Sequence, residues 1–199
     1  MTEIKIAAIV EGHGECEAVP ILVRRIALDV DPGFVPCVLS PLRIPASRLV
    51  KQGEIERSID LVARKLQGQG GIIVILDCDA EDCCPAQAGP QLLERARASR
   101  GDILISVVLA KKEFEAWFIA AADSLRGKRN LANDLQSPSD PEGIRDAKGW
   151  LGKHMPSGYD PVIDQASFTH IFSFCEAAKN PSFRRLLSRV RAQIRTMIS

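Results

Sequence analysis

Two apolar stretches decide the fold: Ile4-Lys5-Ile6-Ala7-Ala8-Ile9-Val10, followed by Glu11-Gly12-His13-Gly14-Glu15, and Ile72-Ile73-Val74-Ile75-Leu76, followed by Asp77-Cys78-Asp79. Each is short, rich in β-branched residues and bounded by glycine or an acidic residue, which is typical of a strand buried on both faces. The carboxyl ends of parallel strands meet at one edge of an open α/β sheet, where ligands bind. Carboxylates brought together there repel one another unless protons or a divalent cation offset their charge. The sequence therefore predicts a magnesium-type site.

The rest of the first 125 residues alternates between strand-like and helix-like patterns. We expect further strands at 34–39 and 103–109, and helices at 17–28 and 92–98. A third helix is amphipathic, with a buried face formed by Ile55, Ile59, Val62 and Leu66. This alternation predicts an α/β fold with a small parallel sheet flanked by helices.

Prolines help to place the element boundaries. Pro20 is compatible with the first helix only in its first turn, and Pro90 is expected in the loop before the 92–98 helix. Residues 126–165 are rich in proline and glycine and form a loop-rich insert, and two helices are expected at 166–178 and 182–198. We therefore expect an α/β domain at 1–125, with 126–199 as an insert and helical elaboration packed on the same domain.

The candidate metal ligands begin with Glu11, Asp77 and Asp79, because their hard carboxylate oxygens suit Mg²⁺ or Mn²⁺. Asp-x-Asp also occurs in ordinary acidic loops, and a tight strand-to-helix turn accounts for Gly12 and Gly14. That turn leaves an acidic residue at the strand end, Glu11, unexplained. The charge of Glu15 favours the helix N-terminus in the same turn.

A second group of candidates is Lys111-Lys112-Glu113-Phe114-Glu115-Ala116-Trp117, directly after the 103–109 strand. Glu113 or Glu115 would add a carboxylate to the same edge of the sheet, and Lys111 or Lys112 would meet a phosphate. The alternative is ordinary helix-start chemistry, in which acidic residues are favoured in the first turn. The apolar face of Phe114, Trp117, Phe118 and Ala121 is interpreted as core.

The net charge of +1 gives no overall argument for a nucleic-acid or membrane partner. From residue 179 onward, however, there are six basic residues and no acidic ones. This helix either contacts nucleic acid or presents a solvated basic face. With no bilayer-length apolar run and no N-terminal signal, we expect a cytoplasmic protein. Its six cysteines are then free thiols, with soft-metal binding by Cys78, Cys83 and Cys84 as the alternative.

These motifs resemble the TOPRIM fold, which topoisomerases, primases, OLD-type nucleases and RloB-like proteins share. Val10-Glu11-Gly12-x-Gly14-Glu15 and the strand ending in Asp77-x-Asp79 carry the resemblance. Two later motifs look like a bacterial TOPRIM-related family known only as a domain of unknown function, number 4276. They are Glu113-Phe114-Glu115-Ala116-Trp117 and Pro181-Ser182-Phe183-Arg184-Arg185-Leu186-Leu187.

The resemblance implies that Glu11 is a general acid/base or a metal ligand and that Asp77 and Asp79 bind Mg²⁺ or Mn²⁺. Further carboxylates would come from Glu15 and from Glu113 or Glu115. Many TOPRIM proteins carry a third aspartate two positions later, where this chain has Glu81 followed by Asp82. The implied activity is a metal-dependent nuclease in DNA repair or phage defence. In this interpretation Lys111 or Lys112 stabilises charge at the phosphorus.

Two rival interpretations stay open. A phosphatase of the haloacid-dehalogenase type would use Asp77 as nucleophile and Asp79 as acid/base, but it gives Glu11 no role and expects threonine where Glu81 stands. A non-catalytic metal-binding module of a larger defence or repair assembly would need a partner, for which an ATPase is the expected candidate. A hydrolase with a Cys/His nucleophile has no support, because no such residues are evidently paired.

Overall fold

The computed structural model describes residues 4–67, 70–79 and 83–199. A 5-stranded sheet with the strand order β2-β1-β4-β5 lies at the centre, and β3 also pairs with β1. The strands are β1 (Lys5–Val10), β2 (Cys37–Val38), β3 (Leu42–Arg43), β4 (Gly71–Cys78) and β5 (Leu104–Lys111). All of these pairings are parallel. The predicted α/β fold with a small parallel sheet is confirmed.

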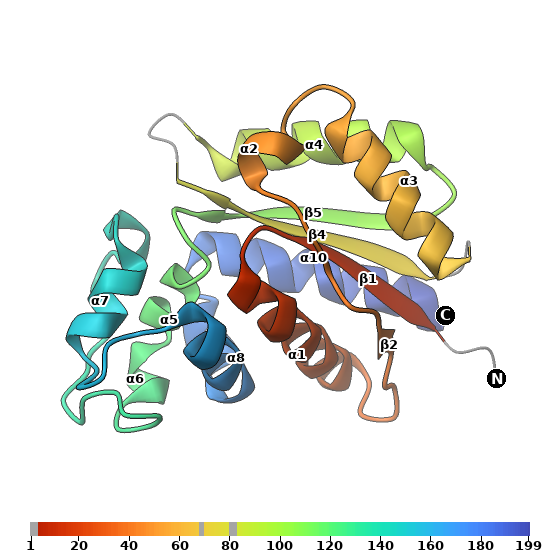
Figure 1. The fold of residues 1–199 in the computed structure, drawn as a ribbon. Helices are drawn as coiled ribbons and strands as arrows, with labels where there is room; N and C mark the ends of the chain where they lie inside the picture. The colour runs from red at the N-terminus through yellow and green to blue at the C-terminus, as the bar shows by residue number, and fades with distance from the viewer. Residues whose placement is uncertain (1–3, 68–69, 80–82) are drawn as a thin grey trace.

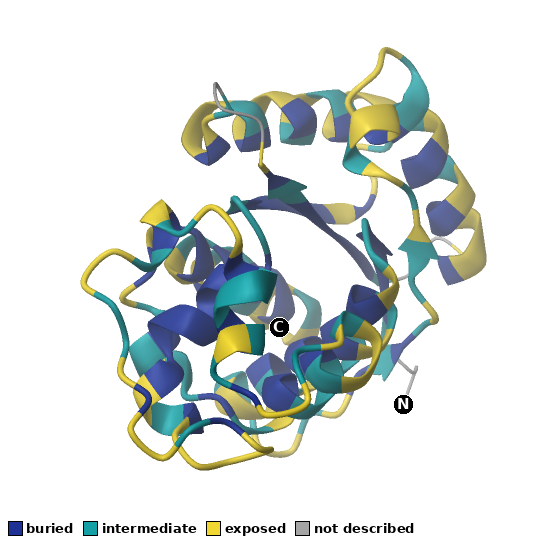
Figure 2. Ribbon diagram, turned by 60° about the vertical axis from the view of Figure 1, so that its left-hand side comes forward, coloured by how far each residue is buried: buried dark blue, intermediate teal, exposed yellow. Residues whose placement is uncertain are grey.

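Helices cover both faces of the sheet (Figure 1). One face carries α1 (His13–Val30) and α10 (Pro181–Ile198), and the other carries α3 (Glu54–Leu66) and α4 (Pro85–Ser99). The short α2 (Ala46–Leu49) precedes α3. Along β4, Ile73 and Ile75 join the core shared with α1 and α10, whereas Ile72, Val74 and Leu76 join the core shared with α3 and α4. Burial on both faces, visible in Figure 2, explains why this strand reads as a continuous apolar run.

The amphipathic helix is confirmed as α3, whose buried residues include all four predicted positions. The predicted positions of two prolines are wrong. α1 begins at His13, four residues before the predicted start, because the Glu15 carboxylate accepts the Gly12 N–H at the helix start. Pro20 therefore lies inside α1. α4 begins at Pro85, a favoured first position, so Pro90 also lies inside a helix.

The predicted strand at 34–39 is shorter than expected. β2 has 2 residues, and its backbone bonds to β1 are donated by Cys37 to Ile4 and by Leu39 to Ile6. Pro36 and Pro41, which have no N–H to donate, flank it. The chain then makes a second short pairing with β1 as β3.

Residues 116–177 lie beyond the carboxyl ends of the strands, at the opposite end of the molecule from both termini (Figure 1). They contain α5 (Ala116–Ala120), α6 (Ala122–Leu125), the 3₁₀ turn η1 (Pro141–Gly143), α7 (Ala147–Lys153), α8 (Pro161–Ile171) and α9 (Phe174–Ala177). The expected single helix at 166–178 is wrong, because the chain breaks between α8 and α9. The 182–198 helix is confirmed as α10.

An aromatic core joins this part to the sheet domain. Trp117 packs against Phe114 and Phe183, and its indole N–H donates to Ser182 Oγ at 2.9 Å. Phe118 packs against Phe168 of α8, which itself lies along α1. The Phe/Trp face is thus core, as predicted. Among the described residues, no helix has the length and apolarity required to cross a membrane.

Candidate functional site

The candidate site lies where β1 and β4 end. Glu11 follows β1, and its Oε2 atom accepts the backbone N–H of Asp77, near the end of β4, at 3.3 Å. The adjacent strands place these two acidic residues together although they are 66 positions apart. A pocket of about 390 Å³ opens here, and its lining includes Glu11, Glu15, Asp77 and Lys148. The side chain of Glu11 thus reaches the end of β4 beside Asp77, while the convergence of their carboxylates on one cation stays a prediction.

Glu15 lies at the start of α1 with both carboxylate oxygens hydrogen-bonded. One accepts the Gly12 N–H, and the other accepts Gln165 Nε2 of α8 at 3.3 Å. Gly14 allows α8 to approach, since a Cβ atom there would overlap the Gln165 side chain and the Pro161 carbonyl. Glu15 therefore fixes the helix start and α8 while it contributes negative charge to the pocket.

Asp77 is the most electrostatically disfavoured carboxylate of the site. Its Oδ1 atom accepts the Phe114 N–H at 2.9 Å, which orients the side chain. Burial raises the pKa of Asp77 well above its usual range, and the charges of Glu15, Glu115 and Glu11 raise it further, against the opposing effect of Lys148. Additional positive charge in this pocket would stabilise the ionised form of Asp77.

Lys148, from α7, supplies the positive charge present at the site. Its Nζ atom lies 3.1 Å from Glu115 Oε2 and 3.5 Å from Glu113 Oε1, and its backbone N–H donates to Glu113 Oε2 at 3.1 Å. Burial disfavours the ammonium, but Glu115, Asp77 and Glu113 outweigh burial and raise the pKa of Lys148 above its usual range. Lys148 is therefore protonated at neutral pH, with the carboxylates around it.

Glu115 is fully buried, and burial raises its pKa despite the opposing charge of Lys148. Its other oxygen, Oε1, accepts the Tyr159 hydroxyl at 3.1 Å. Burial, followed by the charge of Glu115, raises the pKa of Tyr159 far above its usual range, so the phenol stays protonated and can donate. Glu113, Glu115 and Tyr159 thus fix the position of Lys148.

The remaining predicted residues lie apart from the pocket lining. Lys111 Nζ is 3.8 Å from Glu142 Oε2, and Lys112 Nζ is 3.5 Å from the backbone carbonyl of Asp79, whose side chain is exposed. Lys112 has a left-handed backbone (φ 67°) where the chain turns out of β5. Glu81 and Asp82 lie outside the described residues. The lysine that lines the pocket is Lys148 rather than either predicted lysine.

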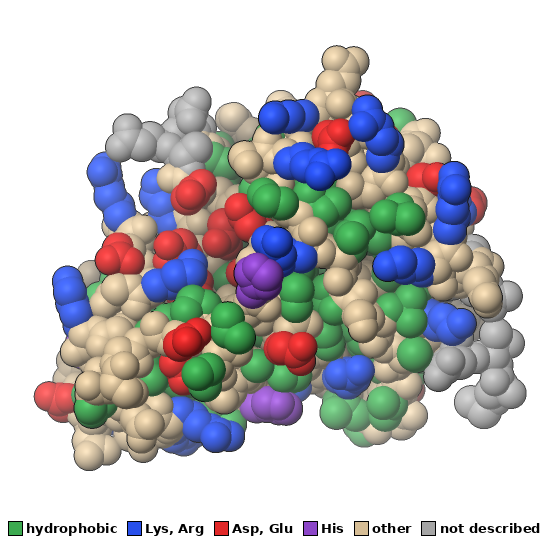
Figure 3. All heavy atoms as spheres, in the orientation of Figure 1, with side chains coloured by type: hydrophobic (Ala, Val, Ile, Leu, Met, Phe, Trp, Pro, Cys, Tyr) green, Lys and Arg blue, Asp and Glu red, His purple; other side chains and the backbone are tan. Residues whose placement is uncertain are grey.

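The carboxylate oxygens of the site are ligands that a hard divalent cation prefers, but the protein does not provide a complete coordination shell. Among residues 4–67, 70–79 and 83–199, no group of three or more His, Cys, Asp or Glu side chains is positioned to hold a metal ion. Mg²⁺ commonly uses only one or two protein carboxylates, with water and substrate phosphate oxygens as its other ligands. Glu11 and Asp77 fit that smaller donor set, in a pocket where Lys148 does not fully offset the burial and the acidic neighbours of Asp77. Figure 3 shows acidic side chains interspersed with basic ones on the left half of the view, where α5, α6, α7 and α8 lie in Figure 1.

The expectation of six free thiols is wrong. Cys78, at the end of β4, and Cys83 form a disulfide with a Cα–Cα distance of 5.6 Å. The remaining cysteines, Cys16, Cys37, Cys84 and Cys175, are free. The soft-metal alternative loses two of its three thiols, since they are joined to each other.

Sequence reasoning did not single out Lys148, Tyr159 or Gln165. All three lie in the 126–165 region, where apolar periodicity is weak. The one local signal is Asp146, whose side chain accepts the Gly149 N–H and caps α7, which carries Lys148. Helix capping would have predicted α7, but not the direction in which its lysine points.

A family model described as "Domain of unknown function (DUF4276)" matches residues 10–191. The chain belongs to the DUF4276 family. The sequence-based resemblance to that family is confirmed, whereas the TOPRIM assignment stays a prediction. No curated protein matches the chain. A solved structure, "C-terminal region of the Burkholderia pseudomallei OLD protein", is similar at 14% identity and a TM-score of 0.43, covering 98% of this chain and 100% of that chain. A similarity of this degree carries no information about the site of this DUF4276 protein.

Proposed function

We propose that this DUF4276 protein is a Mg²⁺- or Mn²⁺-dependent phosphodiesterase of the TOPRIM type that acts on nucleic acid. The observation that carries the proposal is the contact of Glu11 with Asp77 across two strand ends, in a pocket shared with the ammonium of Lys148. Carboxylates for a cation and an ammonium for a phosphate are the groups that phosphoryl transfer requires.

In this proposal Glu11 and Asp77 would hold the cation. A bound divalent cation would polarise the phosphate and lower the pKa of an attacking water. The Phe114 N–H keeps the Asp77 carboxylate facing the pocket. Lys148, fixed by Glu113 and Glu115, offers its ammonium to the negative charge that grows on the phosphate oxygens as water attacks. The chain would thus provide both a cation site and a preorganised positive charge.

A second function is favoured by one specific observation, the ion pairing of Lys148 with the acidic cluster. A lysine can replace a metal ion as the neutralising charge, and the protein would then be a non-catalytic module within a larger defence or repair assembly. A partner ATPase stays a prediction for either function.

A cleavage assay on the full chain tests the proposal. The protein is stripped with a chelator, supplied with Mg²⁺ or Mn²⁺, and incubated with single- and double-stranded DNA and RNA. Bis(p-nitrophenyl) phosphate and p-nitrophenyl phosphate are tested in parallel, since a haloacid-dehalogenase-type phosphatase prefers the monoester. We expect metal-dependent cleavage of nucleic acid and of the diester.

The matched variants are Glu11→Gln and Lys148→Met, with Glu94→Gln, an exposed glutamate of α4, as the charge control. Loss of the Lys148 ammonium is expected to reduce turnover about 100-fold, as for other transition-state charge donors. Glu11→Gln is expected to reduce activity to background, and Glu94→Gln to leave it unchanged. Equal rates for the wild type and all three variants would rule out the enzyme and leave the non-catalytic module.

A further inference from the structure

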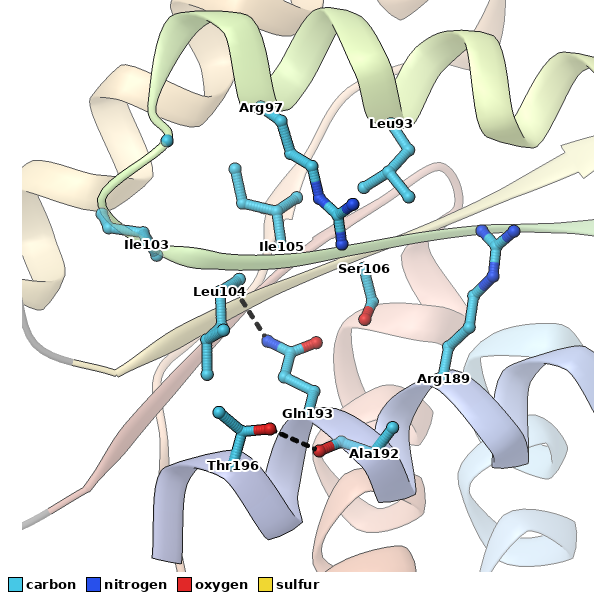
Figure 4. Close-up of a pocket in the computed structure, with 11 residues that line it drawn as sticks. Leu93, Arg97, Ile103, Leu104, Ile105, Ser106, Arg189, Ala192, Gln193 and Thr196 are labelled. Atoms are coloured by element: carbon cyan, nitrogen blue, oxygen red, sulfur yellow. Dashed lines mark hydrogen bonds between the residues drawn. The ribbon is translucent and has the colours of Figure 1, made fainter. Parts of the chain in front are cut away.

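The free edge of the sheet carries a second pocket, distinct from the candidate site. Within the described part of the chain, β5 pairs with β4 on one side and with no strand on the other. α4 and α10 pack against β5, and a pocket of about 440 Å³ lies between them at the start of the strand (Figure 4). Pockets of this size commonly accept small molecules. At about 3.3 Å per residue, β5 separates this pocket from the candidate site by roughly 20 Å.

Three arginines surround this edge. Arg97, in the last turn of α4, and Arg189 of α10 line the pocket, and their guanidinium groups approach it from opposite sides (Figure 4). Arg185, one helical turn from Arg189, lines a neighbouring small cavity that Arg189 shares. Arg189 donates to the Val107 carbonyl, which anchors its side chain at the strand edge. The positive charge of Arg189 is therefore held in place beside β5.

Among the described residues, none of these three arginines has an acidic partner within ion-pairing distance. The ion pairs among the described residues include none with Arg97, Arg185 or Arg189. Burial lowers the pKa of Arg189, and repulsion from Arg185 and Arg97 lowers it further. Because arginine keeps its charge, a bound anion would relieve this mutual repulsion. The planar fork of a guanidinium suits phosphate oxygens particularly well.

Gln193 adds a second requirement for the ligand. Its Nε2 atom donates to the carbonyls of Leu104 at 2.9 Å and Ile72 at 3.3 Å, which fixes the orientation of the amide, because only the NH₂ group can donate. Its Oε1 atom is buried without a hydrogen-bond donor, in a side chain that is 6% exposed and lines the pocket. A buried acceptor of this kind is stabilised by a ligand that brings an N–H or O–H group.

We infer that this pocket binds a nucleotide, with the phosphate between Arg97 and Arg189 and a sugar hydroxyl or base amino group donating to Gln193 Oε1. Leu93, Ile103 and Ile105 provide the apolar wall that a base requires. The nucleotide is either a free mononucleotide or one unit of a nucleic-acid strand, since both present the same groups. The inference does not depend on the proposed phosphodiesterase activity.

The test is isothermal titration calorimetry of the full chain with adenosine monophosphate, adenosine and inorganic phosphate. A chelator is present throughout, so that metal binding at the candidate site plays no part. We expect saturable binding of adenosine monophosphate and weaker binding of both fragments. Arg97→Ala is expected to weaken binding at least about tenfold through loss of charge-assisted hydrogen bonds. Arg97 is exposed, so the variant is expected to fold, and its thermal unfolding is compared with that of the wild type.

Arg24→Ala, which removes an exposed arginine of α1, is the matched control and is expected to bind like the wild type. Binding of a fluorescein-labelled single-stranded DNA, measured by fluorescence anisotropy, distinguishes a free mononucleotide from one unit of a nucleic-acid strand. If adenosine monophosphate displaces the DNA, the pocket takes a unit of a strand; if it binds without displacing the DNA, the pocket takes a free nucleotide. Absence of binding, or equal affinity of the wild type and the folded Arg97→Ala variant, would overturn the inference. A failed cleavage assay would leave this result unaffected.

Discussion

Replacing Lys148 by methionine tests the electrostatic account of the candidate site. At the 3.1 Å between Lys148 Nζ and Glu115 Oε2, an effective dielectric constant of about 20 gives an attraction of about 5 kcal/mol. The Lys148 side chain is 38% exposed, so water screens part of this attraction, and we halve the expected loss to about 2.5 kcal/mol. Methionine retains most of the side-chain volume, so the variant mainly removes the charge.

The pH dependence of this loss of stability follows from Glu115, the buried partner of Lys148. Burial raises the pKa of Glu115 above its ordinary value of 4.5, and loss of Lys148 raises it further. A carboxyl group whose pKa is higher in the folded than in the unfolded state destabilises the folded protein at pH values above its unfolded-state pKa. This destabilisation decreases as the pH falls towards that pKa. The destabilisation by Lys148→Met is therefore largest from neutral to mildly alkaline pH, decreases as the pH approaches 4.5, and decreases again at pH values above the ordinary lysine pKa of 10.5, where the stabilising charge of Lys148 is itself lost.

Urea unfolding at about pH 8 and about pH 5 measures both effects. Lys153→Met, an exposed lysine in the same helix, is the control and is expected to change stability by less than about 0.5 kcal/mol. Adding Glu115→Gln to Lys148→Met is expected to restore part of the lost stability, because no buried charge is left unpaired. A loss of stability that is independent of pH, or strictly additive effects in the double variant, would show that Lys148 does not act on stability through its charge on Glu115.

Three further outcomes are expected. Asp77→Asn keeps the oxygen that accepts the Phe114 N–H and removes a disfavoured charge. It is expected to raise the free energy of unfolding by about 1 kcal/mol at about pH 8, a gain that disappears at pH values where aspartate is protonated; urea titration checks both. Gly14→Ala would overlap α8 and is expected to cost about 2 kcal/mol in thermal unfolding, whereas Gly89→Ala, with ordinary contacts only, is neutral or stabilising by about 0.5 kcal/mol. Denatured, unreduced protein is expected to react with a thiol reagent at four cysteines, since Cys78 and Cys83 are joined.

The sequence predicts the sheet well because its central strands are buried on both faces. Strands β1, β4 and β5 read as continuous apolar runs, and the acidic residue after β1 meets the one ending β4 across the parallel pairing. Element boundaries were harder to predict where local rules conflict. Pro20 argues against a helix interior, but the interaction of Glu15 with Gly12 starts α1 earlier and places the proline inside it.

The positively charged residue of the site could not be predicted, because its position depends on tertiary packing. Lys148 lies on a short helix in a loop-rich region, and its role arises only when α7 brings it to Glu113 and Glu115. The charge of α10 was visible in the sequence, but its distribution was not. Arg189 turns to the edge of β5, whereas Arg191 pairs with Asp29 of α1 at 2.6 Å. Side-chain direction on a helix depends on what packs against each face.

The proposed function requires that the carboxylates of Glu11 and Asp77, at the ends of two adjacent strands, share one divalent cation. Electron paramagnetic resonance of free Mn²⁺ measures this directly, without any substrate. The wild type and Glu94→Gln are expected to bind Mn²⁺ saturably and equally, and Glu11→Gln is expected to bind about 10- to 100-fold more weakly. If Glu11→Gln binds Mn²⁺ as tightly as the wild type, or if the wild type does not bind Mn²⁺ at all, Glu11 and Asp77 do not form a shared cation site.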